Sequence, residues 1–357
     1  MPLLSLVPPP EGKSPADKVS PGETHDVSGV SRLYTFQSGE WVLEPNQSPS
    51  PLDVFMPITG DIIECQEVPA RSLPDPFKCP RPSTSRSISR SEIHDLQSVS
   101  DKLKLCVKFC HLISLNPTDI KYVEFGSDVL RDYLLSIVRE GGLEFEDDSM
   151  CLIAEHDNGD VYVVVRGSSS YSEIQSNLQA IAIPTSGDRM YINERFLKHA
   201  LNGLESQIRI RLQRVKSLNN IYVTGYSTGG AVACIIASIL ASSFPHASIC
   251  CVTFGSPIAG DENFSKWLRQ RVVNYHRVIL DTDMMPLIPA SIPFSQCGEA
   301  LCVRYNQNER PLLEIWPEIS DSRWAVSVRD VARSNRQKSL ASVDVYCQQV
   351  CEALGNL

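Results

Sequence analysis

Residues 221–240 read IYVTGYSTGGAVACIIASIL. A short β-branched and aromatic run comes first, then Gly225-Tyr226-Ser227-Thr228-Gly229-Gly230, then a continuous apolar run. We predict a strand over 221–224 and a buried helix over 228–242, because the apolar run is only about half a membrane span. A G-x-S-x-G segment between a strand and a helix is typical of a nucleophile elbow, where small flanking residues avoid clashes in a tight turn around the serine.

Short apolar strands alternate with helices after this segment. The predicted elements are a strand over 248–254, a helix over 261–273, a strand over 276–280, a strand pair near 301–305 and 312–316, and a helix over 340–354. Strands that alternate with helices predict a parallel sheet with helices on both faces.

The pattern before the elbow is also regular. It predicts helices over 91–115, 127–141 and 194–215, and a hairpin of strands 151–155 and 161–165. The hairpin turn is Asp157-Asn158-Gly159, because Asn-Gly between apolar runs is a strong hairpin signal.

The first 90 residues differ in composition from the rest. Fifteen of the 24 prolines lie within residues 1–82, and serine is dense there. We therefore predict a Pro/Ser-rich, largely disordered arm over 1–90 and one domain over 91–357. The N-terminus has no basic segment and only a short apolar patch, so no signal peptide is indicated and we expect a cytoplasmic protein.

Charge and cysteine content narrow the function classes. The formal net charge of −9 and the lack of a long basic run argue against a nucleic-acid partner. Twelve cysteines in a long chain without a secretory signal indicate reduced thiols. The pairs Cys106/Cys110 and Cys347/Cys351 have helical spacing, which fits core-facing helix positions better than metal sites. No cofactor, metal or transmembrane signature is present.

Three further segments carry a recognisable pattern. They are Arg166-Gly167-Ser168-Ser169-Ser170, Thr253-Phe254-Gly255-Ser256-Pro257 with Gly260, and Asp283-Met284-Met285-Pro286 with Pro289. With the elbow, in this order and spacing, they resemble the class 3 lipases, the family of the filamentous-fungal triacylglycerol lipases. The resemblance implies an α/β-hydrolase fold, with a mostly parallel central sheet, helices on both faces and the nucleophile elbow at Ser227.

The resemblance also implies roles for particular residues. Ser227 matches the nucleophile and Asp283 the triad acid, although an aspartate that caps a turn before proline is the alternative for Asp283. The backbone amides of Thr228 and Ser168 match the oxyanion hole, and residues 169–184 match the mobile lid. The lid segment has few apolar side chains, which weakens the case for binding at a lipid interface.

The triad histidine of the family is missing. The histidines are residues 25, 94, 111, 156, 199, 246 and 276, so none follows Asp283. Without a base, a serine hydroxyl is a poor nucleophile at neutral pH. His276, His199 and Lys338 are the candidate replacements, although each also fits an ordinary structural position. The region that should hold the base is 337–346.

Other family histidines are replaced too. Tyr226 precedes the nucleophile where histidine is usual, and the family's two other His-containing segments are here Asn193-Glu194-Arg195-Phe196 and Gln296-Cys297-Gly298-Glu299. Such losses indicate relaxed constraint around the site.

Three functions remain open on the sequence. The first is an impaired lipase-like serine ester hydrolase acting on a lipid or acyl ester. The second is an inactive lipase-like pseudoenzyme that serves as a binding or scaffold protein, with peripheral membrane contact or a protein partner. The third, supported only by composition, is an interaction protein that docks through its arm.

Overall fold

The computed structural model describes residues 82, 84–115, 132–139, 150–168, 181–185, 190–201, 204–288, 293–304, 311–318 and 341–357. It also describes the backbone of four short strands nearer the N-terminus, β1 (Thr24–Asp26), β2 (Ser31–Gln37), β3 (Glu40–Leu43) and β4 (Ile63–Glu64). None of the helices in these ranges is both long enough and apolar enough to cross a membrane.

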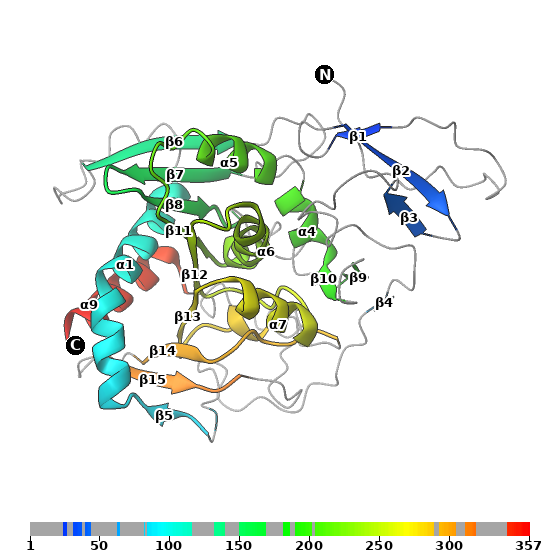
Figure 1. The fold of residues 1–357 in the computed structure, drawn as a ribbon. Helices are drawn as coiled ribbons and strands as arrows, with labels where there is room; N and C mark the ends of the chain where they lie inside the picture. The colour runs from blue at the N-terminus through cyan, green and yellow to red at the C-terminus, as the bar shows by residue number, and fades with distance from the viewer. Residues whose placement is uncertain are drawn as a thin grey trace.

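A nine-stranded sheet forms the centre of the fold (Figure 1). Its strands, in spatial order, are β5 (Arg86–Ser87), β15 (Leu312–Trp316), β14 (Ala300–Arg304), β13 (Asn274–Leu280), β12 (Ser248–Phe254), β11 (Asn220–Tyr226), β8 (Asp160–Val165), β7 (Met150–His156) and β6 (Tyr133–Arg139). The five strands from β14 to β8 run parallel, and the strands at both edges run antiparallel. Because the carboxyl ends of the parallel strands share one edge, the loops after β8, β11 and β13 open at the same edge.

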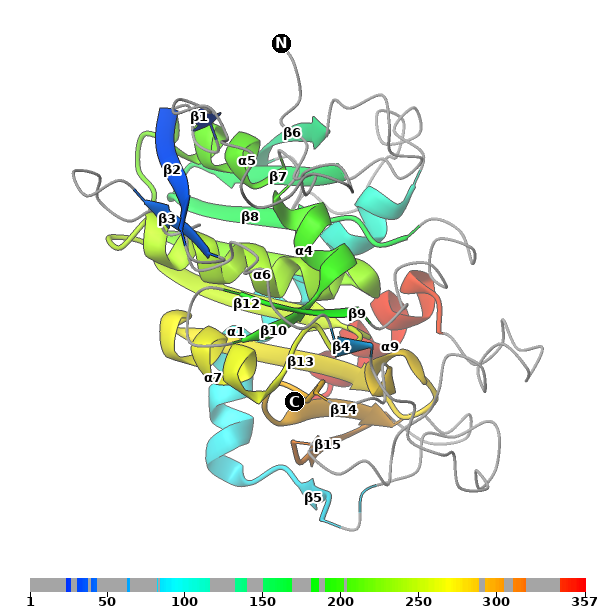
Figure 2. The same ribbon diagram turned by 90° about the vertical axis from the view of Figure 1, so that its right-hand side faces the viewer.

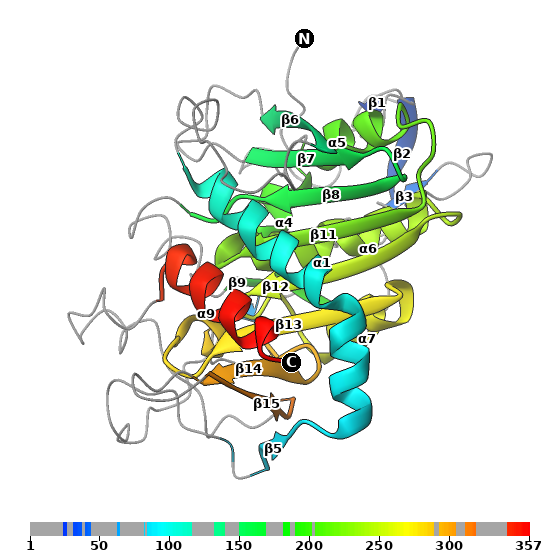
Figure 3. The same ribbon diagram turned by 90° about the vertical axis from the view of Figure 1, so that its left-hand side faces the viewer.

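Helices cover both faces of the sheet. On one face lie α1 (Arg90–Ser114) and α9 (Val343–Gly355), which cross side by side (Figure 3). The other face carries α4 (Glu194–Leu201), α5 (Leu204–Leu212), α6 (Thr228–Ser243) and α7 (Glu262–Arg271) (Figure 2). The strand β8 packs Val163 into the core beneath α6 and Val164 into the core beneath α1. Alternate residues of one strand thus reach two apolar layers, and the predicted α/β-hydrolase class with its covered parallel sheet is confirmed.

The helix α6 is buried along nearly its whole length, and its first turn lies against the sheet backbone. A Cβ atom on Gly229 would come within 2.5 Å of the Val165 carbonyl oxygen, and one on Gly225 within 2.3 Å of the Gly229 carbonyl oxygen. Only glycine permits this approach. The two glycines therefore bring the start of α6 into contact with the ends of β8 and β11.

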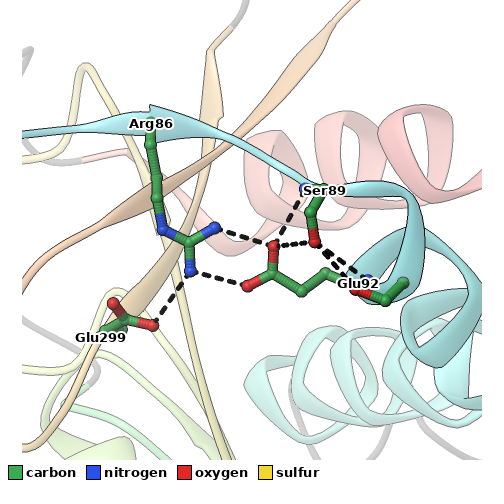
Figure 4. A network of polar contacts seen from close by, with 5 residues as sticks. Arg86, Ser89, Glu92 and Glu299 are labelled. Carbon is green, nitrogen blue, oxygen red and sulfur yellow. Dashed lines mark hydrogen bonds and ion pairs between the residues drawn. The ribbon is translucent and has the colours of Figure 1, made fainter.

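The first long helix begins one residue before its predicted start. Ser89 caps α1, its hydroxyl accepts from the Glu92 amide, and the Glu92 carboxylate accepts from the Ser89 amide at 2.9 Å. Figure 4 shows that Arg86 of β5 joins this capping box and also reaches Glu299 at 3.6 Å. The network links the start of α1 to the edge of the sheet.

The predicted helix over 127–141 is wrong for residues 133–139. These residues form β6, which pairs antiparallel with β7 over seven residues, from Tyr133 opposite His156 to Arg139 opposite Met150. Leu134 is 61% exposed on this edge strand, so its apolar character does not mark a helix face. Pairing with β7 overrides the local helical spacing.

The predicted helix over 194–215 is two helices, α4 and α5. The intervening sequence is Asn202-Gly203, and both residues are common where helices end. The hairpin is confirmed as β7 and β8, and Gly159 has φ = 88° in its turn. The other predicted strands and helices from 221 to 354 appear as β11 to β15, α6, α7 and α9.

Part of the predicted arm is paired in strands. β1, β2 and β3 form an antiparallel sheet, and β4 pairs with β9 (Ile181–Pro184), which also pairs with β10 (Tyr191–Asn193). The division of the chain at residue 90 stays a prediction.

Substitution of Gly229 by alanine should destabilise the protein by about 1–3 kcal/mol or more, because the new methyl group meets backbone atoms that cannot move aside. Gly355→Ala is the matched control, since no atom lies within 4 Å of its added Cβ. Chemical denaturation of both variants measures the difference. Equal stabilities would contradict the close packing of α6 against β8.

Candidate active site

Ser227 occupies a strained turn between β11 and α6. Its φ of 54° is the only positive φ of a non-glycine residue in the described part of the chain, and its ψ is −133°. The Ser227 amide donates to the Phe254 carbonyl at 2.9 Å, and the Gly230 amide donates to the Ser227 carbonyl at the same distance. The serine is therefore fixed between β12 and the first turn of α6, in the geometry expected of a nucleophile elbow.

Ser168 and Thr228 lie next to each other beside this turn. The Ser168 amide donates to the Thr228 hydroxyl oxygen at 2.8 Å, and the two hydroxyl oxygens are 2.9 Å apart. The structure thus brings together the two residues expected to form the oxyanion hole. It also gives the Thr228 side chain a role that the sequence did not reveal, because this hydroxyl holds the Ser168 amide.

Asp283 follows β13 and is buried. Its Oδ1 accepts from the Met285 amide at 3.0 Å, and its Oδ2 accepts from the Tyr346 hydroxyl at 2.6 Å. The Leu280 amide donates to the same tyrosine oxygen at 3.2 Å. The Tyr346 side chain, which belongs to α9, therefore takes the position at the carboxylate where the N–H of a triad histidine would be expected.

Gly255 makes room for this pair. Its φ is 55°, and a Cβ atom on it would come within 2.6 Å of Asp283 Oδ2 and 2.7 Å of the Tyr346 hydroxyl oxygen. The Thr253–Pro257 segment, recognised in the sequence only as part of a pattern, therefore includes the residue that admits the Asp283–Tyr346 contact.

A second tyrosine closes the same region. The Tyr226 hydroxyl donates to the Ala341 carbonyl, and the Tyr226 and Tyr346 rings lie 5.5 Å apart at a tilt of 59°. Ala341 and Tyr346 both belong to the segment expected to hold the triad base. The family pattern points to this segment but not to Tyr346 itself, and the only sequence signal for Tyr346 is its position in that segment at the start of an apolar helix.

The environment keeps both tyrosines neutral. Burial raises the pKa of Asp283 to about 7, although hydrogen bonds from Tyr346, Met285 and Ala341 favour its charged form. Burial likewise raises the pKa of Tyr346 and of Tyr226 above that of an ordinary tyrosine. Neither hydroxyl can therefore take a proton from a serine at neutral pH.

His276 lies on β13 level with Val252 of β12 and Thr224 of β11. Ser227 is three residues further along, about 10 Å, and two strands away, about another 10 Å. Burial lowers the pKa of His276, and its strand neighbours Val278 and Leu280 join the core under α1 and α9. The structure does not bring His276 to the elbow.

The structure describes only one of the two remaining candidates. His199 is half-buried on α4, a helix that packs on α6, and has interactions there. Lys338 and lid residues 169–180 lie outside the described residues. Among described residues, none donates to or accepts from the Ser227 hydroxyl.

Two segments that depart from the family pattern have structural roles. The Asn193 side chain accepts from the Arg195 amide at 3.0 Å and the Phe196 amide at 3.3 Å, which caps α4. The buried Gln296 amide donates to the Pro286 carbonyl, just past Asp283. Across the described ranges, no three His, Cys, Asp or Glu side chains are arranged to hold a metal ion.

Residues 162–292, which include the elbow, Ser168 and Asp283, match the family described as Lipase (class 3). The chain is class 3 lipase-like. A lipase of Rhizomucor miehei is 27% identical over 173 residues, which are 45% of this chain and 47% of that protein. The lipase-like chain thus spans about half the length of this curated relative.

Solved lipase structures share the fold. The native Rhizomucor miehei lipase–propeptide complex superposes with a TM-score of 0.52, at 20% identity, over 83% of this chain and 96% of that chain. A lipase from Rhizopus microsporus var. chinensis gives a TM-score of 0.50, at 17% identity, over 74% of this chain and 95% of that one. A triacylglycerol lipase whose catalytic centre is described as a serine protease triad also gives 0.50, at 19% identity, over 73% and 95%. The lipase-like chain therefore has the α/β-hydrolase fold.

Replacement of Ser227 by glycine should give a more stable protein than replacement by alanine, by about 1–3 kcal/mol, because glycine alone relaxes the positive φ. Both variants lack the hydroxyl, so their difference isolates backbone strain. Denaturant midpoints measure it. A more stable alanine variant would show that the turn is not strained.

Removal of the Tyr346 hydroxyl should destabilise the protein more at about pH 8 than at about pH 5. The folded-state pKa of Asp283 is raised, so this carboxyl lowers stability progressively as pH rises from about 4 to 7. Above that range Tyr346→Phe removes the side-chain donor from a buried carboxylate and leaves it only backbone amide donors, which costs about 1.5–3 kcal/mol, against about 1 kcal/mol when the acid is neutral.

Tyr226→Phe is the control for this experiment, because the Tyr226 hydroxyl donates to a backbone carbonyl rather than to Asp283. Its effect on the free energy of unfolding should vary little between the two pH values. A Tyr346→Phe effect that is equally independent of pH would contradict the Asp283–Tyr346 pairing.

Proposed function

We propose that this lipase-like chain is a pseudoenzyme, in which the hydrolase fold is kept for binding and ester hydrolysis is lost or nearly lost. The observation that carries the proposal is the hydrogen bond from Tyr346 to Asp283. A triad needs this carboxylate to orient an imidazole and to stabilise the imidazolium. Here the carboxylate is buried, bonded to a neutral phenol, and no histidine follows it in the chain.

The chemistry explains why this replacement stops turnover. In a serine hydrolase the base takes the serine proton as the hydroxyl attacks, then returns it to the leaving group. The raised pKa of Tyr346 makes its hydroxyl a donor that is already engaged with Asp283. Loss of the base from a triad reduces the rate roughly 10⁴- to 10⁶-fold.

The binding half of the site is better preserved than the catalytic half. The elbow at Ser227 keeps its strained turn, and α6 begins directly after it with its free amides at the sheet edge. Ser168 and Thr228 lie beside it, and because the Ser168 amide already donates to the Thr228 hydroxyl, the Thr228 amide is the oxyanion donor that stays available. A carbonyl oxygen of an acyl ester is the ligand that such a site suits, and the similar proteins are named as lipases, which supports a lipid or acyl ester as ligand.

The second candidate is a slow ester hydrolase, and one observation favours it. The backbone strain at Ser227 is maintained, although a glycine would relax it. Strain that persists at a functional position is consistent with a serine still used for chemistry. Residual catalysis from the oxyanion site and ligand binding alone amounts to about 10³- to 10⁴-fold over water.

A fluorophosphonate probe distinguishes the two candidates, because it labels only a serine activated as a nucleophile. We expect the wild-type protein and Ser227→Ala to show the same background labelling. Rhizomucor miehei lipase, measured in parallel, supplies the positive control for the probe. Labelling that is present in the wild type and absent from Ser227→Ala would overturn the pseudoenzyme proposal and support the hydrolase.

The binding role has its own test. A non-hydrolysable ketone analogue of an acyl ester, which keeps the carbonyl oxygen, should raise the melting temperature of the folded wild-type protein progressively as its concentration increases. Thr228→Val serves as the matched variant, since it removes the hydroxyl that holds the Ser168 amide. No stabilisation by analogues of several acyl lengths would reject an acyl ligand.

A further inference from the structure

Arg277 is a buried cation in the centre of the sheet. It lies on β13 opposite Thr253 of β12, and its strand neighbour on the same face, Ile279, packs into the core beneath α6 and α7. Arg277 is 3% exposed. Its Nη2 donates to the Gly298 carbonyl at 3.2 Å, whereas Nε and Nη1 have no hydrogen-bond partner among the described residues. Unsatisfied donors of this kind are rare in native cores unless a water molecule or an ion meets them.

No carboxylate in the described ranges forms an ion pair with this guanidinium. The acid whose charge acts on it is Glu318, which is paired instead with Arg269 at 3.3 Å. A guanidinium keeps its proton in proteins, so Arg277 stays charged although burial lowers its pKa. A buried charge without a counter-charge is strongly unfavourable. Arg277 therefore needs one negative charge nearby.

A small cavity adjoins Arg277 on the face of the sheet that α6 and α7 cover. Its volume is about 20 Å³, enough for one particle of about the size of a water molecule. None of the residues assigned to the triad or the oxyanion hole lines it, so it is separate from the proposed ester site. Besides Arg277, its lining includes Cys234 of α6, Ser265 of α7, Tyr275 of β13 and Cys297.

The other polar groups around this cavity are neutral. No Asp or Glu is among the lining residues. The Cys234 thiol donates to the Tyr275 hydroxyl oxygen at 3.7 Å, which leaves the phenol proton available for donation. Burial raises the pKa of Tyr275 and of Cys297, so both groups stay protonated. The lining therefore offers protons to a ligand but no counter-charge to Arg277.

We propose that this cavity binds one small monovalent anion, chloride, as the counter-ion of Arg277. The anion accepts from an unpaired guanidinium N–H and balances the buried charge. One negative charge is sufficient, because the neighbouring Arg269 is already paired with Glu318. Chloride is only slightly larger than a water molecule, so it suits the cavity volume, whereas carboxylates and sulfate are too bulky.

The lining allows the anion to exchange with solvent and links binding to stability. Tyr275, Ser295 and Cys297 are only half-buried, so one side of the cavity lies near the surface. The cavity is formed by elements that meet only in the folded chain, among them α6, α7 and β13. An anion that binds there stabilises the folded state by mass action.

The melting temperature in two salts tests the proposal. At constant ionic strength, replacement of gluconate by chloride should raise the melting temperature of the wild-type protein by about 2–4 °C for each tenfold increase in chloride above its dissociation constant. Arg277→Met should abolish the difference between the salts. Arg269→Met is the matched control and should keep it, because this arginine is paired with Glu318. Equal wild-type melting temperatures in both salts, or a chloride effect that survives in Arg277→Met, would overturn the proposal.

Anomalous diffraction from wild-type crystals grown in bromide tests the position and needs no variant, so it also decides the case in which Arg277→Met does not fold. We expect a bromide peak in the cavity, in contact with an unpaired nitrogen of Arg277. A water molecule or a carboxylate of the chain at that place would overturn the proposal. A bromide peak without any difference between the two salts in solution would mean an adventitious ion only, and would overturn it as well.

Discussion

The close contact of backbone with backbone at the start of α6 is the constraint on which the rest of the molecule depends. Gly225 and Gly229 bring the end of β11 to the first turn of the helix, and Gly229 also meets β8. The adjacent turn places Ser227 at the edge where β8, β11, β12 and β13 end. Ser168 and Asp283 follow β8 and β13 at the same edge, so the placement of Ser227 beside them follows from the packing of one helix on the sheet.

A second contact, between Asp283 and Tyr346, is the one on which the proposed loss of hydrolysis rests. The carboxylate has its place at the end of β13, but its partner comes from the last helix of the chain. Since α9 packs across α1 on the opposite face from α6, the two layers of the fold meet at this hydrogen bond. The position of the Asp283 carboxylate and its hydrogen-bond partner are therefore specified by different parts of the sequence.

The sequence predicted the centre of the fold well because its signals there are local. The apolar strands, the Asn-Gly turn and the glycines around Ser227 each specify their own conformation. The helix predicted for the residues of β6 was wrong, because the strand conformation depends on pairing with β7. The sequence of 133–139 alone does not encode that pairing. Strong helical spacing over 194–215 likewise concealed the break between α4 and α5.

The candidate site was predicted in part for the same reason. Each of Ser227, Thr228, Ser168 and Asp283 lies within three residues of the end of a strand, so the local motifs place them. The pairing of Tyr346 with Asp283 joins residues 63 positions apart and requires the positive φ of Gly255. The unpaired donors of Arg277 were also invisible in the sequence, because they follow from burial of a side chain that usually lies at the surface.

The two tyrosines have an evolutionary consequence. An imidazole placed beside Asp283 would have to displace the Tyr346 hydroxyl, and the neighbouring Tyr226 ring, anchored to Ala341, would have to move to open a path to Ser227. A single substitution does only one of these things and loses a buried hydrogen bond without restoring a relay. A histidine relay at Asp283 therefore requires coordinated changes at both tyrosines, so that no single substitution creates one.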